Sequence, residues 1–169
     1  MSITKKIVII GLVLALAACN NSGPFGGGGD SAGAGSGAIV PGSANDPTSP
    51  LFFAQTIGDR VLFVVNEAQL TPEAESILDS QAQWLSTNTD FTAIIEGHAD
   101  EQGTREYNLA LGARRATAAR EYLISRGVAG NRLKVISYGK ERPIEICSEE
   151  ACYAKNRRAV TVLSSDLSS

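Results

Sequence analysis

Residues 96–116 read EGHADEQGTREYNLALGARRA and place a polar loop directly in front of a long helical pattern. The stretch holds the only histidine of the chain, His98, together with Asp100 and an Arg-Arg pair. An apolar, β-branched run at 91–97 precedes the loop, so the pattern predicts a strand, a loop and a helix in succession. The charged side chains therefore lie where a strand ends and a helix begins.

The apolar periodicities on either side predict the other elements of one domain, residues 51–169. A helix is expected over 70–88, because the Thr71 hydroxyl can cap its start and Pro72 suits its first turn. Gly127 can end the helix that follows the loop. The remaining expected elements are strands at 60–65, 132–139 and 157–164 and a short helical turn near 149–156. The order β-α-β-α-β-(α)-β predicts an α+β sandwich, a mixed sheet with two main helices packed on one face.

The N-terminal residues 1–18 are typical of a lipoprotein signal peptide. Lys5 and Lys6 precede an apolar run of 12 residues, 7–18, which is shorter than the roughly 20 residues of a membrane-spanning helix. The run ends in LAAC, which resembles the bacterial lipobox, so we expect Cys19 to carry the acyl chains, including palmitate, that anchor the mature protein. Several acyl chains bind a membrane more stably than one.

Residues 19–50 are rich in Gly, Ser, Ala and Pro and predict a flexible tether between the lipid and the domain. Removal of residues 1–18 leaves 13 basic and 18 acidic side chains, a net charge of −5. A nucleic-acid partner is therefore not expected, because nucleic-acid binders carry a basic surface.

Two further cysteines, Cys147 and Cys152, lie close together in CSEEAC. In an exported protein this spacing is most simply a local disulfide. A metal site is not expected, because no histidine lies near and two thiols are only half of a zinc site. No cofactor is expected either.

His98 raises the question of catalysis. The sequence offers no second histidine for a zinc ion and no Ser or free Cys placed beside His98 as a nucleophile. We therefore expect a hydrogen-bonded structural histidine and a protein that is not an enzyme.

Recognition is the alternative for the same stretch. Asn108, Leu111 and Arg115 lie on one face of the expected helix, and Asp100 lies in the loop before it. A carboxylate and a guanidinium that converge can hold a zwitterionic amino-acid end, Asp100 accepting from the ammonium and Arg115 gripping the carboxylate. The same two side chains could equally pair with each other, and the spacing alone leaves both possibilities open.

The quoted stretch, together with ISYGKERP at 136–143 and NRRAVTV at 156–162, resembles the OmpA-like peptidoglycan-binding domain family. The resemblance covers about residues 58–163, and the lipobox and tether make the chain similar to the lipid-anchored members of the family. It implies noncovalent binding of peptidoglycan through the meso-diaminopimelate residue of its stem peptide.

The resemblance also implies roles for individual residues. Asp100 matches the family's ligand for the diaminopimelate ammonium, and Arg115 matches the ligand for its carboxylate. Asn108 and Leu111 match positions that line the same pocket. Arg114 is interpreted as solvent-facing or structural. Arg157 and Arg158 fall in the NRR signature of the family and are interpreted as supports of the sheet end, with direct ligand contact as the alternative.

One departure from the family concerns Phe63-Val64-Val65-Asn66, where members commonly carry FDFD. The first Asp of that motif contributes to the family's pocket, and here Val64 replaces it beside Phe63. Because valine offers no acceptor to an ammonium, we expect an altered pocket edge, with the contact missing or supplied by Asn66 or a backbone carbonyl.

The resemblance finally implies a cellular role. The domain faces the periplasm, the lipid holds the outer membrane, and the protein joins the Tol envelope system, with TolB and other Tol proteins as partners, in envelope integrity and cell division. The alternative is a protein-interaction module that binds TolB with weak or no wall binding, for which Val64 is the motive.

Overall fold

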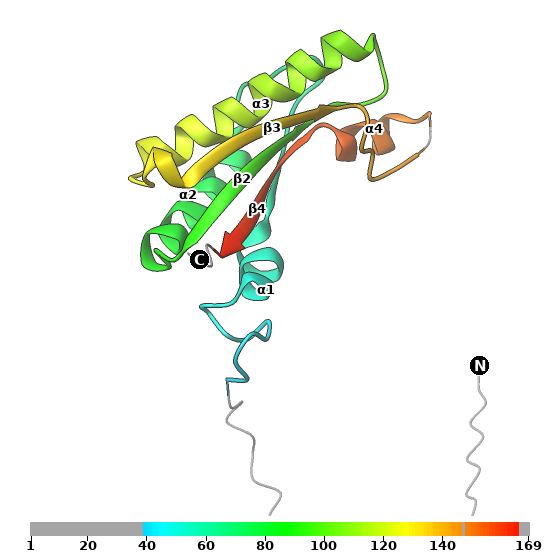
Figure 1. Ribbon diagram of the computed structural model, residues 1–169. Coiled ribbons are helices and arrows are strands. Elements are labelled where there is room, and N and C mark those ends of the chain that lie inside the picture. The colour runs from blue at the N-terminus through cyan, green and yellow to red at the C-terminus, as the bar shows by residue number, and fades with distance from the viewer. Residues whose placement is uncertain (1–38, 147, 166–169) are drawn as a thin grey trace, which may run out of the picture. The chain divides into compact units, whose positions relative to one another are not determined.

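A computed structural model describes residues 39–146 and 148–165. The expected signal peptide, the expected lipidation site Cys19 and Cys147 lie outside these residues. The described residues form four strands and two long helices, α2 and α3, most of which are labelled in Figure 1. The strands are β1 Arg60–Leu62, β2 Phe91–His98, β3 Leu133–Gly139 and β4 Arg158–Ser165. The long helices are α2 Pro72–Thr87 and α3 Arg105–Ser125, and the short helices are α1 Pro50–Phe52 and α4 Glu150–Asn156.

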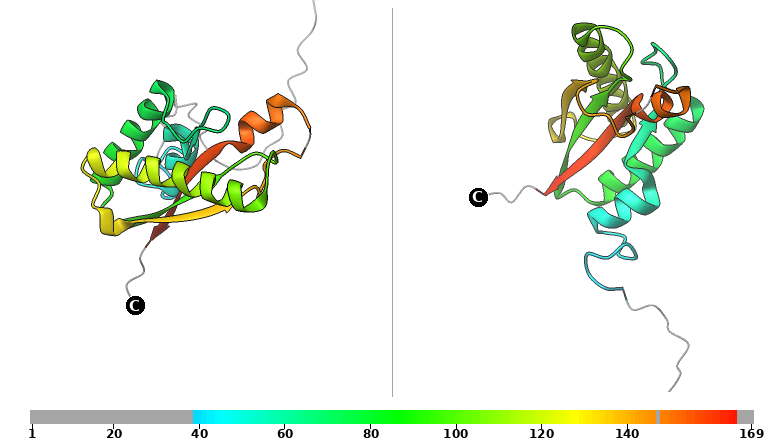
Figure 2. Two further views of the ribbon diagram at one scale, coloured as in Figure 1. Left: turned by 90° about the horizontal axis from the view of Figure 1, so that it is seen from above. Right: turned by 90° about the vertical axis from the view of Figure 1, so that its right-hand side faces the viewer.

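The strands form one mixed sheet in the order β1-β4-β2-β3. β2 and β3 are parallel, because α3 connects them as a crossover, and β4 is antiparallel to both β1 and β2. Figure 2 shows α2 and α3 on the same side of this sheet. The expected α+β fold with two main helices on one face is confirmed.

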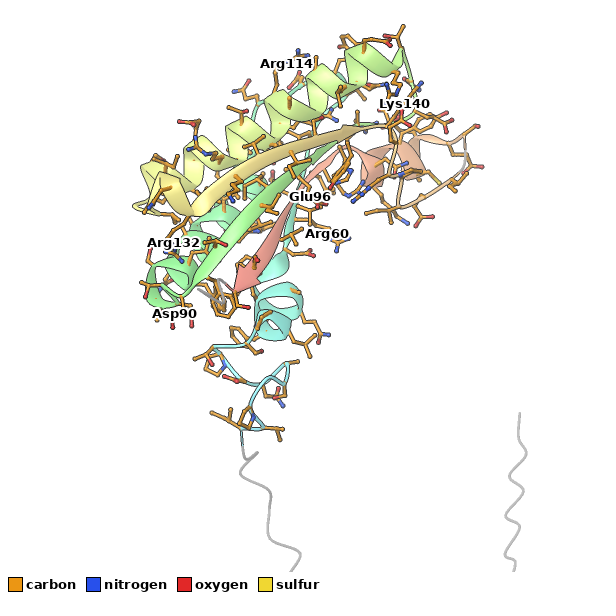
Figure 3. All side chains as sticks on the ribbon, in the orientation of Figure 1. Arg60, Asp90, Glu96, Arg114, Arg132 and Lys140 are labelled. Carbon is orange, nitrogen blue, oxygen red and sulfur yellow. The ribbon has the colours of Figure 1, made fainter. Side chains whose placement is uncertain are left out.

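Alternation along the strands sets which side chains meet the helices. Ala93 and Ile95 of β2 are buried against the helices, whereas Glu96 lies on the opposite face of the sheet (Figure 3). The core under α2 and α3 includes Leu78, Leu85 and Leu123, each with no exposed surface.

The start of α2 at Thr71 and the end of α3 at Gly127 follow the expected signals, and Thr104 is a further cap that was not predicted. The Thr71 hydroxyl accepts a hydrogen bond from the Ala74 amide at the start of α2, and the Thr104 hydroxyl accepts from the Tyr107 amide at the start of α3. Gly127 follows α3 with a φ of +97°, as the expected helix end requires.

A pair of glycines brings α3 directly onto β2. A Cβ atom on Gly97 would lie 1.8 Å from the carbonyl oxygen of Gly112 in α3. No side chain larger than hydrogen fits between the two backbones, so Gly97 and Gly112 set the distance between the strand end and the helix that carries Arg115.

The first strand is shorter than expected. Residues 60–65 were predicted as a strand, but β1 ends at Leu62, and the Phe63 amide bonds to the carbonyl of Arg157, the residue before β4, at 2.9 Å. The chain turns away because the carbonyls of Val64 and Glu67 accept hydrogen bonds from Arg115 instead of from a neighbouring strand.

Packing of the domain also extends a few residues N-terminal to residue 51. The Trp84 indole donates to the Pro47 carbonyl at 2.7 Å, and Ser49 is buried and caps α1. α1 continues into a π-helical turn, Phe53–Gly58, whose Phe53 ring packs against Trp84. No helix in the described ranges is long and apolar enough to cross a membrane.

Candidate functional site

The candidate site lies where β2 gives way to α3. The Ala99 amide bonds to the Gly139 carbonyl of β3 at 2.8 Å, and the chain then leaves the sheet at Asp100. The Asp100 carboxylate accepts from the Gln102 amide at 3.2 Å, and the Asn108 side chain donates to the Gln102 carbonyl at 2.8 Å. Because Gly103 takes a φ of +93°, the loop folds back onto the first turn of α3.

Arg115 lies beneath this loop with no exposed surface. Its guanidinium donates to three carbonyl oxygens, those of Glu67 at 2.8 Å, His98 at 2.9 Å and Val64 at 3.1 Å. Burial lowers the pKa of Arg115 to about 10, against the opposing charge of Asp100. Arg115 is thus charged at neutral pH and fastens the segment after β1 to the end of β2.

Asp100 does not take Arg115 as its ion-pair partner. Its carboxylate contacts the guanidinium of Arg157 at 3.2 Å, and both side chains are nearly buried, at 10% and 6% exposed. Arg157 also donates to the Phe63 carbonyl at 3.2 Å and to the carboxylate of Glu150 in α4. Burial lowers the pKa of Arg157, but its bonds to Glu150 and Asp100 outweigh burial and raise it overall.

The other residues expected at the site occupy three kinds of position. Asn108 and Leu111 are buried on the inner face of α3, and Phe63 is buried with its ring 5.3 Å from the Arg115 guanidinium. Val64 is half exposed. Arg114 is exposed and points outward from α3 (Figure 3).

Arg158 neighbours Arg157 at the sheet end. It is buried and donates to the carbonyls of Asn156 at 3.3 Å and Arg142 at 3.1 Å. Burial lowers its pKa to about 10. These contacts join the start of β4 to the loop after β3.

An open concavity of about 520 Å³ lies beside the Asp100 loop. It is lined by Asn66, Gln102, Gly103, Thr104 and Tyr107. The Tyr107 hydroxyl donates to the Asn66 side-chain oxygen at 3.5 Å across it, and Asn66 holds a left-handed φ of +57°. Its lining residues Gln102, Gly103 and Thr104 directly follow Asp100 and Glu101 in the chain, and Asp100 itself is 8% exposed.

Gln102, Thr104 and Tyr107 were not among the residues expected to line the site. Their position directly after Asp100, in the loop and first turn of α3, is the signal that could have identified them. Asn66 was anticipated only as a substitute for the missing carboxylate at position 64.

His98 is buried, and both ring nitrogens lack a hydrogen-bond partner within the described residues. The nearest carboxylate oxygen, on Glu96, is 3.6 Å from Nε2. Burial, followed by the charges of Arg158 and Arg142, lowers the pKa of His98 to about 4. The imidazole is therefore neutral at pH 7. The expectation of a hydrogen-bonded histidine is wrong for the described residues. The His98 ring packs against the Tyr138 ring instead, at 5.6 Å between centroids.

A second, more apolar groove of about 410 Å³ lies away from Asp100, at the outer edge of β1. Leu62, Ala74, Ile77 and Ile144 provide most of its apolar surface. Its arginine, Arg60, is paired with Asp59 at 2.7 Å. Glu73 and Lys155 add charged side chains to its lining.

Cys152 in α4 is disulfide-bonded. Its expected partner, Cys147, lies outside the described residues. Among the residues that the structure describes, no group of three or more His, Cys, Asp or Glu side chains is placed to hold a metal ion.

Comparison with known proteins gives consistent matches. The OmpA family matches residues 62–157. The chain is 49% identical to the peptidoglycan-associated lipoprotein of Rhizobium meliloti (strain 1021), over 96% of this chain and 90% of that protein. It is 37% identical to the protein of the same description in Haemophilus influenzae, over 92% and 95% of the two chains.

Solved structures agree with these relatives. The crystal structure of the peptidoglycan-associated lipoprotein from Burkholderia pseudomallei matches with a TM-score of 0.64 and 37% identity, over 72% of this chain and 98% of that one. The C-terminal domain of Helicobacter pylori MotB shares the fold, with a TM-score of 0.60 and 22% identity over 64% and 86% of the two chains.

Proposed function

Because the chain belongs to the OmpA family, and within it to the peptidoglycan-associated lipoproteins, we propose that it binds the diaminopimelate-containing stem peptide of peptidoglycan through the concavity beside Asp100. Binding is noncovalent and no bond of the wall is cleaved. The protein binds the wall and catalyses no reaction on it.

One observation carries the proposal: a carboxylate and a guanidinium of opposite charge flank the same loop without neutralising each other. Asp100 pairs with Arg157, and Arg115 bonds to carbonyl oxygens. A diaminopimelate side chain ends in an ammonium and a carboxylate on one carbon, so it presents the complementary charges. Asp100 accepts from the ammonium.

Arg115 acts on the ligand carboxylate from below. A guanidinium carries five N–H groups, and the hydrogen bonds found for Arg115 in the described part of the chain use one on each of its three nitrogens. Because Arg115 is fully buried, its positive charge rather than an exposed N–H group attracts the ligand carboxylate in this proposal. Asn108 and Leu111 hold the loop and the helix face that shape the pocket.

The proposed cellular role combines the lipid anchor near the N-terminus with the wall-binding domain. Cys19 carries the lipid that holds the outer membrane, and the residues after it form the tether. The domain, whose packing includes Pro47 and Ser49, binds the wall on the periplasmic side. We place the protein in the Tol–Pal system, with TolB and other Tol proteins as partners, in envelope integrity and cell division.

A second candidate function is a protein-interaction module that binds TolB with weak or no wall binding. The observation in its favour is Val64, which is half exposed and leaves an apolar side chain where the family has an acidic one.

Cosedimentation with purified peptidoglycan tests the proposal. Residues 20–169 are mixed with the wall material beside Asp100→Asn and the matched control Asp90→Asn, an exposed aspartate at the far end of β2 (Figure 3). The parent and the control are expected in the pellet and Asp100→Asn in the supernatant. A parent that stays in the supernatant overturns wall binding, and an Asp100→Asn variant that pellets like the parent overturns the site.

A further inference from the structure

Three charged side chains, Glu150 of α4, Arg157 and Asp100, contact one another in a row that ends at the candidate site. Glu150 contacts Arg157, and Arg157 contacts Asp100 at 3.2 Å. The two inner members are nearly buried, whereas 67% of the Glu150 side chain is exposed. Glu150 can therefore be changed without opening the core.

The middle member of this row works against ammonium binding. Asp100 attracts an ammonium only as far as its negative charge is not already balanced, and the Arg157 guanidinium beside it both balances that charge and repels a cation. Such effects are strong here because nearly buried charges are weakly screened by solvent. A second carboxylate on Arg157 offsets its charge.

Other contacts of α4 reach the same loop. The Tyr153 hydroxyl donates to the Glu101 carboxylate at 3.0 Å, and the Ser148 hydroxyl to the same oxygen at 3.5 Å. From the β3 side, Lys140 donates to the carbonyls of Glu101 and Gly103. Lys140 thus holds the backbone of the loop, and Tyr153 and Ser148 hold its Glu101 side chain, through contacts that do not involve Glu150.

We propose that Glu150 is a specificity-determining residue that acts through Arg157: by sharing the guanidinium, it leaves Asp100 enough negative charge to select a ligand bearing a free ammonium. The inference rests on the proposed function of the Asp100 site. Glu150 touches no ligand, so its effect is confined to ligands whose amine is charged. A residue that merely supports the fold affects charged and uncharged ligands alike.

The test compares Glu150→Gln with Glu149→Gln in residues 20–169. Glu149 is the neighbouring exposed glutamate, and its side chain makes no capping hydrogen bond to α4. Titration calorimetry measures binding of a diaminopimelate stem peptide and of the same peptide acetylated on the side-chain amine. Glu150→Gln is expected to bind the free-amine peptide about two- to fivefold more weakly, the range of a partly exposed ion pair, and the acetylated peptide as the parent does.

Further arms separate the possible failures. In an Asp100→Asn background, whose residual binding of the free-amine peptide is measured at raised peptide concentration, Glu150→Gln is expected to have no further effect, because its influence passes through that carboxylate. Equal weakening of both peptides, or no weakening of either, overturns the role of Glu150 while leaving the site intact. A parent that binds neither peptide overturns the proposed function itself.

Discussion

The Arg115 guanidinium in α3 donates a 2.9 Å hydrogen bond to the backbone carbonyl of His98, the last residue of β2. The same group also bonds to Val64 and Glu67, so one side chain fastens two segments that flank the candidate site. Arg115 therefore has a structural task in addition to any contact with a ligand.

Replacement of Arg115 by lysine is expected to destabilise the fold. A lysine ammonium is a compact charge without the planar fork of a guanidinium, so it cannot serve three separated carbonyls. Buried acceptors left without donors cost about 1–3 kcal/mol each, and we expect Arg115→Lys to lower the free energy of unfolding by at least about 2 kcal/mol. Urea denaturation measures this, and the exposed Arg114→Lys is the control. Equal stability of the two variants contradicts the structural role.

The buried imidazole of His98 predicts a stability loss in mild acid. Its pKa in the folded state is about 4, below the 6.5 of a free histidine, so the neutral form favours folding. The contribution is complete above pH 6.5 and is lost as the pH falls toward 4. Between pH 7 and pH 5 the parent should lose about 2 kcal/mol more than His98→Gln does. Parallel urea denaturation at the two pH values checks this, and parallel pH profiles contradict it.

The contact between Gly97 and Gly112 predicts a large effect of one methyl group. In Gly97→Ala the new Cβ meets the Gly112 carbonyl oxygen, a backbone atom that cannot move aside. We expect a loss of about 3 kcal/mol in unfolding free energy. Gly130→Ala is the control, because its nearest neighbours are side-chain ends of Arg120 and Ile124 at 3.3 Å. Thermal unfolding compares them, and similar midpoints contradict the close-contact argument.

Local patterns were sufficient for most of the fold. Caps such as Thr71 and the helix end at Gly127 act within a few residues of their own element, so they can be recognised in sequence. β1 was predicted too long because Val64 and Val65 are good strand residues. Its end is imposed by Arg115, about fifty positions later in the chain.

The candidate site likewise contains residues that the sequence identifies and a contact that only the fold reveals. Asp100 and Arg115 were identified by a motif in which they are fifteen positions apart, but the partner of Asp100 is Arg157, from the far end of the domain. No spacing rule joins a loop after β2 to the residue before β4. That pairing depends on the sheet order, which places β4 beside β2.

Val64 offers a test of what a single carboxylate adds to the pocket. Its side chain is 48% exposed, so Val64→Asp introduces a carboxylate without burying it. A carboxylate at this edge gives the ligand ammonium a second acceptor, and a charge-assisted hydrogen bond contributes about 1–3 kcal/mol. We therefore expect Val64→Asp to bind a diaminopimelate stem peptide about fivefold or more tightly than the parent. Val65→Asp, at a neighbouring position that is 39% exposed, controls for added negative charge alone. Equal affinities of the parent and Val64→Asp mean that the pocket edge is not missing an acceptor for the ligand ammonium. Equal gains in affinity for Val64→Asp and Val65→Asp mean that overall charge rather than a specific contact attracts the peptide.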